Sequence, residues 1–449
     1  MSNTSNKDTI LFTVVAIILF LAIFITHFYY REYTFTRSAD SWIPSLQKLD
    51  NAIWKRFVQF IFWFGWDILW VVVIVFYAQF NRASSAFLLT TTAKFIAFIA
   101  ALKMLWNDPA PYMSRGNINA LVCSQNTFQT PSLEVALAAF VYCMAHYLAY
   151  DWIDVIRPRV KRTDKNTIQG GNNPAVYEDE DEDYFLHDTS SYQQAKERDF
   201  GFWVWVTFII FTVFLISYAA MYLGINTLDQ VVYAMCLGYG LFCVVYFYLK
   251  DWAVQRYILV SEKMIPSSQV IVNLVQQVVL VVLLIVGVRI LYYFQIQDFT
   301  VNPNWKSEHF DECGILPFPS FFDKEMSLTY NFLYLDLGIV VGLAFDSLVL
   351  GGTRTDFNQL RTSEERSPIL GFVFRFLITV GWILLNLWGF TSLLKMLIHH
   401  WLFILAIPYF LCGFGLFSFL KYIFEIVGAT RPEIHPIPEM TSVELRKAD

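Results

Sequence analysis

The sequence predicts an all-α fold: a polytopic transmembrane helical bundle of about ten spans. Of its 449 residues, 56% are hydrophobic and 18% are aromatic, whereas a soluble chain is usually ~45–50% apolar. The excess lies in long apolar runs, each near or above the ~20 residues that a membrane-crossing helix needs. No segment between these runs exceeds ~50 residues, which is too short to bury an independent core of useful size.

The ten candidate spans are residues 9–30, 57–80, 85–106, 132–152, 201–222, 229–249, 268–295, 328–351, 369–394 and 398–427. The first run is too long for the apolar part of a cleaved signal peptide, and no cationic cluster precedes it, so we expect an uncleaved helix. The expected organisation is an extra N-terminal helix in residues 1–40, a membrane domain in 41–430 with a long loop at 152–200, and a tail in 431–449.

Loop charges predict the orientation. The loops that share a side with the two termini carry roughly twice as many Lys and Arg residues as the opposite loops, which places both termini in the cytosol or matrix. The 152–200 loop contains a basic cluster, Arg157–Arg162, and an acidic run, Glu178–Asp183. The acidic run fits a solvated segment or a docking strip for a basic partner. It does not fit nucleic-acid binding, which needs cations for the phosphate backbone.

The six cysteines fall into two groups. Four lie inside spans and are expected to pack as small apolar residues: Cys143, Cys236, Cys243 and Cys412. Cys123 and Cys313 fall in separate loops on the side opposite the termini, where an oxidising lumen would allow a disulfide. The sequence leaves open whether these two residues are close enough to form one.

Polar residues recur at the ends of spans on that same side. Lys103 is followed, after six residues, by Ala110-Pro111. The segment Pro131-Ser132-Leu133-Glu134 opens the fourth span. The segment 219–226 closes the fifth span with Tyr-Leu-Gly-Ile-Asn, and Gln230 follows Asn226 by four residues. Phosphoryl transfer needs such a cluster: cations that hold the phosphate, a nucleophile, and an acid for the leaving group.

In order and spacing, these segments resemble the three motifs of the phosphatidic-acid-phosphatase type 2 superfamily: Lys-x6-Arg-Pro, Pro-Ser-Gly-His and Ser-Arg-x5-His-x3-Asp. Lys103, Pro111, Pro131 and Ser132 match their motif positions. The pattern Tyr-Leu-Gly-x-x-Thr-Leu-Asp-Gln-Val, which begins at position 222, is the most specific part of this resemblance. Within the superfamily, the chain is most similar to glucose-6-phosphatase and sphingosine-1-phosphate phosphatase, whose nine spans match this chain once its first helix is set aside.

The functional positions of the motifs are altered. Ala110 and Ala220 stand where the superfamily has arginines, Glu134 where it has the histidine that protonates the leaving group, and Asn226 where it has the nucleophilic histidine. Gln230 replaces the orienting aspartate, a change that the glucose-6-phosphatase branch tolerates. An amide nitrogen has no nucleophilic lone pair, so Asn226 cannot carry a phosphoryl group. The resemblance therefore implies the helical bundle of a phosphatase without its chemistry.

The charges of the former pocket change as well. Two cationic clamps are lost, and a carboxylate replaces a histidine. We expect Lys103 and Glu134 to form an ion pair, the alternative being that each is solvated separately. The degenerate pocket comprises Lys103, Ala110, Pro111, Ser132, Glu134, Ala220, Asn226 and Gln230.

No other group is expected to replace the missing chemistry. The histidines on or near the same side are His27, His309, His399 and His400, and none has arginine partners or an acid at recognisable spacing. A His-His pair without a further ligand at helical spacing is weak evidence for zinc. We therefore expect no cofactor and no bound metal.

Ionisable groups also lie within the predicted spans: Asp67, Lys94, Arg289, Asp336, Asp346 and Arg375. Such groups often mark a transport pathway. The alternative is internal pairing, for example Lys94 with Asp67, or Arg375 with Asp336 or Asp346. Balanced signs and the absence of a recognisable inverted repeat favour pairing.

The sequence thus predicts a catalytically inactive, phosphatase-like membrane protein that serves as a structural or adaptor subunit of a membrane assembly, or binds a lipid. The rival functions are a residual phosphohydrolase acting on lipid or sugar phosphates, and a transporter. Its expected partners are membrane lipids and other membrane proteins. An endomembrane such as the endoplasmic reticulum is the favoured location, with the mitochondrial inner membrane or plasma membrane as alternatives.

Overall fold

The computed structural model describes residues 6–25, 29–48, 51–79, 82–114, 118–119, 121, 128–168, 200–300, 319–352, 368–397 and 406–427. Within these ranges the chain is helical and contains no strand. Eight helices are long and apolar enough to cross a membrane. The predicted first and last spans are present as the shorter apolar helices Ile10–Phe24 and Ile407–Ser418. The predicted all-α, multi-pass bundle is therefore confirmed.

The first half of the fold contains α1 (Asn6–Phe24), α2 (Arg31–Arg37), α3 (Ile43–Gln47), α4 (Ala52–Trp63), α5 (Asp67–Gln79), α6 (Arg82–Trp106), α7 (Pro111–Ser114), α8 (Leu133–Ile168) and α10 (Phe200–Tyr222). The second half contains α11 (Leu228–Val244), α12 (Lys250–Ser261), α13 (Ser267–Asp298), α15 (Pro319–Val349), α16 (Pro368–Leu384), α17 (Thr391–Leu397), α19 (Ile407–Ser418) and α20 (Leu420–Ile426). Short π-helical turns follow α2, α11 and α16.

Several predicted boundaries were wrong. The predicted loop 31–56 forms α2, α3 and the start of α4, and the predicted span 57–80 is broken by a turn at residues 64–66. The predicted span 328–351 begins earlier, at Pro319, so α15 includes residues that were assigned to a loop. At residues 31–56 and 319–327, charged residues lower the average hydropathy without ending the helical structure. At residues 64–66, by contrast, the helix is interrupted within an apolar run that contains Gly65.

The N-terminal helix packs against the bundle. The rings of Phe12 and Phe247 stack with centroids 4.0 Å apart. Further along α1, Phe20 covers Gly240 of α11, so that a Cβ at this glycine would lie 3.2 Å from the phenylalanine ring. Because a side chain at Gly240 would meet that ring, α1 and α11 approach closely, and the extra helix is an integral part of the fold.

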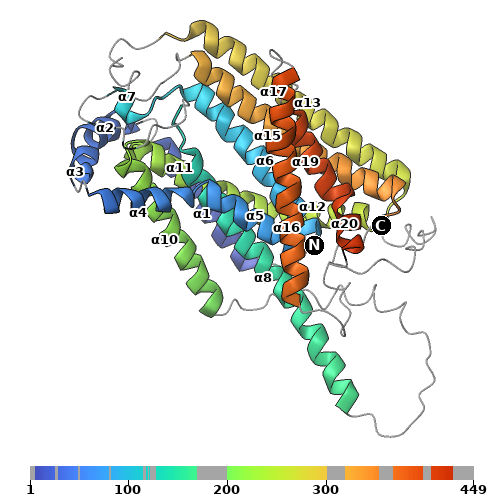
Figure 1. Cartoon of the computed structure of the whole chain (residues 1–449). Helices are drawn as coiled ribbons and strands as arrows, with labels where there is room; N and C mark the ends of the chain where they lie inside the picture. Colours follow the sequence, from blue (N-terminus) through green and yellow to red (C-terminus); the bar gives the residue numbers. More distant parts are fainter. Residues whose placement is uncertain are drawn as a thin grey trace, which may run out of the picture.

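Helix α6 lies between the two halves of the bundle. It contacts α8 on one side and α15 on the other, and Figure 1 shows α6, α15 and α13 running side by side. All three cations of α6 pair with carboxylates of the antiparallel α15. The pairs are Arg82–Asp346 at 2.7 Å, Lys94–Asp336 at 2.6 Å and Lys103–Glu325 at 3.6 Å. We call this set of pairs the α6–α15 ion-pair ladder.

The ladder accounts for three of the six charges expected inside the membrane: Lys94, Asp336 and Asp346. Lys94 pairs with Asp336 rather than with Asp67, which is exposed at the start of α5. Asp346 pairs with Arg82 and Lys421 rather than with Arg375, whose Nε donates to the backbone oxygen of Ala78. Internal pairing is therefore confirmed for Lys94, Asp336 and Asp346, but the individual partners that we expected were wrong.

Small residues bring α15 and α19 together. Gly338 and Gly342 lie one helical turn apart on α15, and a Cβ at Gly342 would lie 2.6 Å from the backbone oxygen of Phe414. At Gly338 a Cβ would collide with the backbone oxygen of Phe410. This is the small-xxx-small arrangement that lets transmembrane helices pack backbone to backbone.

We expect Gly338→Ala to lower the free energy of unfolding by about 1–3 kcal/mol, because the added methyl group overpacks this contact. The matched control is Gly287→Ala in α13, where a Cβ would meet no atom within 4 Å. Unfolding of both variants in a detergent–denaturant titration checks the prediction. Equal stability of the two variants would show that the α15–α19 contact tolerates a methyl group.

Candidate functional site

The three motif segments meet at one end of the bundle, as predicted. Lys103 lies in the last turn of α6, Pro111 begins α7, and Glu134 lies in the first turn of α8. Asn226 lies in the turn between α10 and α11, and Gln230 in the first turn of α11. The convergence follows from topology, because these ends of four membrane-crossing helices lie on the same side.

The turn before Asn226 requires glycine. Gly224 ends α10 with φ of +76°, a conformation that residues with a Cβ rarely adopt. A Cβ there would also lie 2.9 Å from the backbone oxygen of Asn119. The backbone N–H of Asn226 then donates to the backbone oxygen of Ala220 (3.2 Å), which holds the turn against the end of α10. The Tyr-Leu-Gly segment thus fixes the backbone that carries Asn226.

Asn226 is fully buried and its amide is hydrogen-bonded on both sides. Its Nδ2 donates to the backbone oxygen of Gln129 (3.1 Å) and to Oε1 of Gln230 (3.3 Å). Its Oδ1 accepts from Oγ of Ser132 (3.1 Å). Buried polar groups are stable only when satisfied in this way. The side-chain amide of Asn226 therefore connects the third motif segment to Ser132 of the second motif and to Gln129, which lies just before the second motif.

Gln230 completes this network. Its Oε1 also accepts the backbone N–H of Thr227 (3.0 Å), so it caps the start of α11. Its Nε2 donates to the backbone oxygen of Pro109 (3.4 Å), beside Ala110 of the first motif. Four polar residues, Gln129, Ser132, Asn226 and Gln230, are each at most 2% exposed. We call them the amide cluster.

Lys103 is in contact with a residue outside all three motifs. Its Nζ lies 3.6 Å from Oε1 of Glu325, and the two side chains are 3% and 0% exposed. The predicted Lys103–Glu134 ion pair is wrong: no such contact within 4.0 Å occurs between these two described side chains. Oε2 of Glu134 instead lies 3.4 Å from Oγ of Ser132. Glu134 and Glu325 are near enough to interact electrostatically.

The sequence did not identify Glu325 because its segment had been assigned to a loop. One signal was available. Glu325, Asp336 and Asp346 recur at intervals of about three helical turns, which puts carboxylates near one face of a helix. The charges of α6 recur at similar intervals.

The alanines of the site are packed in the core. Ala110, Ala219 and Ala220 are each 0% exposed. Ala110 belongs to a cluster with Met104, and Ala219 to a cluster with Tyr222. A protein interior is packed as densely as an organic crystal, so arginine side chains at these positions would have to displace their neighbours.

The segment after α1 covers the end of this site. Gln47 of α3 donates to the backbone oxygens of Asn119 and Tyr222, both at 3.0 Å. Oγ of Ser38 accepts the backbone N–H of Leu228 (3.1 Å). Arg31 of α2 forms an ion pair with Asp108. These contacts tie residues 31–47 to the helix ends that carry the motifs.

Several of the other predicted positions fall in parts of the chain that the structure does not describe. Cys123, Cys313, His27, His309, His399 and His400 lie outside the described residues, as does the acidic run 178–183. The four cysteines in spans are buried thiols, as expected. In the ranges that the structure describes, no group of three or more His, Cys, Asp or Glu side chains is arranged to hold a metal ion.

The fold and the site together define a class: a polytopic helical membrane protein built on a phosphatase-like arrangement of helix ends. The family model described as the PAP2 superfamily matches residues 82–253. The match is narrower than the 41–430 region named above, but it contains all three motif segments, so the resemblance inferred from them is confirmed. No curated protein and no solved structure matches the chain.

Proposed function

We propose that this protein is a catalytically inactive member of the PAP2 superfamily whose former phosphate site has become part of the packed core of the bundle. Its proposed role is structural: a subunit or adaptor of a membrane assembly, or a binder of membrane lipid. The observation that carries the proposal is the amide cluster, in which Asn226 is buried and hydrogen-bonded where a nucleophile would have to reach a phosphorus atom.

The environment of Lys103 also supports the proposal. The matching lysine of the superfamily holds the substrate phosphate, whereas Lys103 is buried against the carboxylate of Glu325. A phosphate ester entering here would meet Glu325 and Glu134, both negatively charged when ionised, and would have to displace one of them. Removal of a single transition-state donor costs ~10²–10³ in rate. Here the nucleophile, the acid and two cationic clamps are all absent from their motif positions.

The α6–α15 ion-pair ladder weighs against the transport alternative. Ionisable groups on a pathway face a water-filled cavity or a bundle interior that opens. The carboxylates of the ladder are instead 0% exposed and held by cations of the neighbouring helix. The charges of the ladder are therefore explained by the pairing of α6 with α15, and they do not require a transport pathway.

A phosphate-release assay tests the proposal against the phosphohydrolase alternative. Purified protein should release no phosphate above the protein-free background from phosphatidate, sphingosine 1-phosphate or glucose 6-phosphate. The Lys103→Ala variant, assayed in parallel, should be indistinguishable from the unmodified protein. Phosphate release that disappears in Lys103→Ala would contradict the proposal, because it would place this lysine in a working site.

A further inference from the structure

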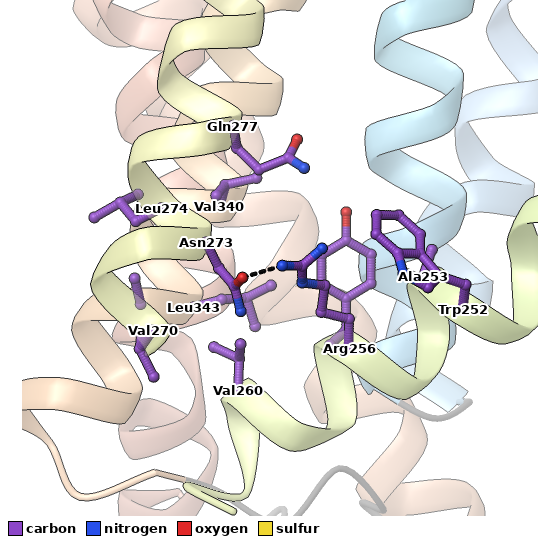
Figure 2. A pocket seen from close by; sticks show the side chains of 12 residues that line it. Trp252, Ala253, Arg256, Val260, Val270, Asn273, Leu274, Gln277, Val340 and Leu343 are labelled. Atoms are coloured by element: carbon purple, nitrogen blue, oxygen red, sulfur yellow. Dashed lines mark hydrogen bonds between the residues drawn. The ribbon is translucent and has the colours of Figure 1, made fainter. Parts of the chain in front are cut away.

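A second polar feature lies at the end of the bundle opposite the amide cluster. Helices α12, α13 and α15 enclose a cavity of ≈ 50 Å³, which adjoins a more open cavity of ≈ 370 Å³ between α12 and α13. Arg256 and Asn273 line both. Figure 2 shows Arg256 reaching from α12 toward Asn273 of α13, with the aliphatic side chains of Val260, Val270 and Leu343 nearby.

Arg256 differs in its partners from the five cations of the bundle that contact a carboxylate. These five are Arg82, Lys94, Lys103, Lys250 and Lys421, apart from Arg31 in the short helix α2. Among the side chains that the structure describes, Arg256 has no carboxylate within 4.0 Å. It donates to the neutral amide oxygens of Asn273 and Gln276, and its guanidinium carbon lies 5.0 Å from the centre of the Trp252 ring. Its positive charge is therefore held in position but not neutralised.

The depth of Arg256 matches that of lipid headgroups. The continuous span Leu228–Ser261 has 34 residues, which is ~51 Å at ~1.5 Å per residue and well beyond the ~30 Å hydrocarbon core. Leu228 begins this span at the motif end, so Arg256, near the other end, lies at the opposite membrane surface. Leu343, which lines the smaller cavity, is within one turn of Asp346, the last carboxylate of the ladder at that end.

The surroundings of the cavity are apolar and open to lipid. Only 11% of the most apolar 18-residue stretch of α13 is buried within the bundle. The helix exposes four aliphatic side chains near the larger cavity in sequence, of which Val272 lines it: Ile271, Val272, Val275 and Val279, each about half exposed. Leu259, Ile265 and Val272 line the larger cavity itself. A soluble anion would gain nothing from these walls, whereas acyl chains would be buried against them.

We propose that this cleft, the Arg256 cleft, binds one anionic phospholipid, with its phosphate on Arg256 and its acyl chains along α13. A guanidinium matches a phosphate geometrically, because two parallel N–H groups can donate to two phosphate oxygens. The amide groups of Asn273 and Gln277, both in the lining, supply further polar contacts to a headgroup. The site is separate from the amide cluster and does not depend on whether that cluster is catalytic.

Native mass spectrometry of the purified protein in mild detergent tests the proposal, with phosphatidylglycerol and phosphatidylcholine as probes. The unmodified protein should retain one phosphatidylglycerol in preference to phosphatidylcholine. Arg256→Gln should reduce that retention about tenfold or more, the effect of losing a charge-assisted hydrogen bond. Arg289→Gln, a matched loss of an arginine from α13, should leave retention unchanged, because Arg289 contacts Met326 and not this cleft.

A second variant separates lipid binding from folding. Asn273→Asp keeps the size of the side chain and leaves Arg256 in place, but it supplies an internal carboxylate that competes with the lipid phosphate. It should lower retention as Arg256→Gln does, while thermal stability in lipid-free detergent stays at or above that of the unmodified protein. Unchanged retention in both variants, equal retention of phosphatidylcholine, or displacement of the lipid by millimolar inorganic phosphate would each overturn the proposal.

Discussion

Replacing Asp346 with asparagine is expected to lower the free energy of unfolding by about 3–5 kcal/mol, the usual cost of breaking a buried ion pair from one side. Asp346 is 0% exposed and contacts two cations, Arg82 and Lys421, each at 2.7 Å. The neutral amide would leave both cations in the protein interior without an anion. Arg82 also donates to the backbone oxygen of Phe417, so the damage would extend from the α6–α15 interface to α19.

Denaturant unfolding of purified Asp346→Asn in detergent measures this effect. Asp67→Asn is the matched control, because Asp67 is exposed at the start of α5 and, within the described part of the chain, has no ion pair. Its free energy of unfolding should change by less than about 0.5 kcal/mol, as for most surface substitutions. If both variants were equally stable, the ladder would contribute nothing to the fold.

The second large effect is expected at Lys103, which matches the first-motif lysine of the superfamily. Lys103→Met should cost about 3–5 kcal/mol, because it leaves Glu325 buried without its cation, close to a second carboxylate, Glu134. Glu325→Gln should cost less, because the amide oxygen of glutamine can still accept a hydrogen bond from Lys103. The double variant Lys103→Met/Glu325→Gln should recover a coupling energy of about 0.5–3 kcal/mol, the range for residues in direct contact.

The double-mutant cycle is measured by unfolding the four proteins under identical conditions. Lys324→Met is the control, since it removes a charge next to Glu325 from a half-buried residue that forms no ion pair with the described side chains. A coupling energy near zero would mean that Lys103 and Glu325 act independently. In that case Lys103 would remain available for an anion, as in the superfamily.

Much of the fold could be predicted from the sequence because a membrane restricts it. Backbone groups in lipid must be satisfied within the helix, so long apolar runs identify helices, and short loops fix their alternating directions. That argument alone brought Lys103, Ser132 and Asn226 to one end of the bundle. It failed where hydropathy is mixed, at residues 31–56 and 319–327, because helices that carry a few charges fall below the average of a membrane span.

The partners of the charges could not be predicted in the same way. Pairing depends on which helices are neighbours and on their register, and hydropathy specifies neither. Lys103 was assigned to Glu134 because both belong to motifs, whereas the closest carboxylate comes from α15, outside the segment that matches the superfamily. Glu325 can be identified as the partner of Lys103 only when the antiparallel packing of α15 against α6 is known.

The central claim is that the former active site has been converted as a unit rather than by one substitution. Asn226→His restores the nucleophile position alone. The histidine would still lie beside Ala110 and Ala220 instead of arginines, with Glu134 instead of the acid and Lys103 held by Glu325. The most direct measurement is phosphate release by purified, folded Asn226→His from phosphatidate and sphingosine 1-phosphate. We predict a rate equal to that of the protein-free background, and turnover above background that Lys103→Ala removes would contradict the account.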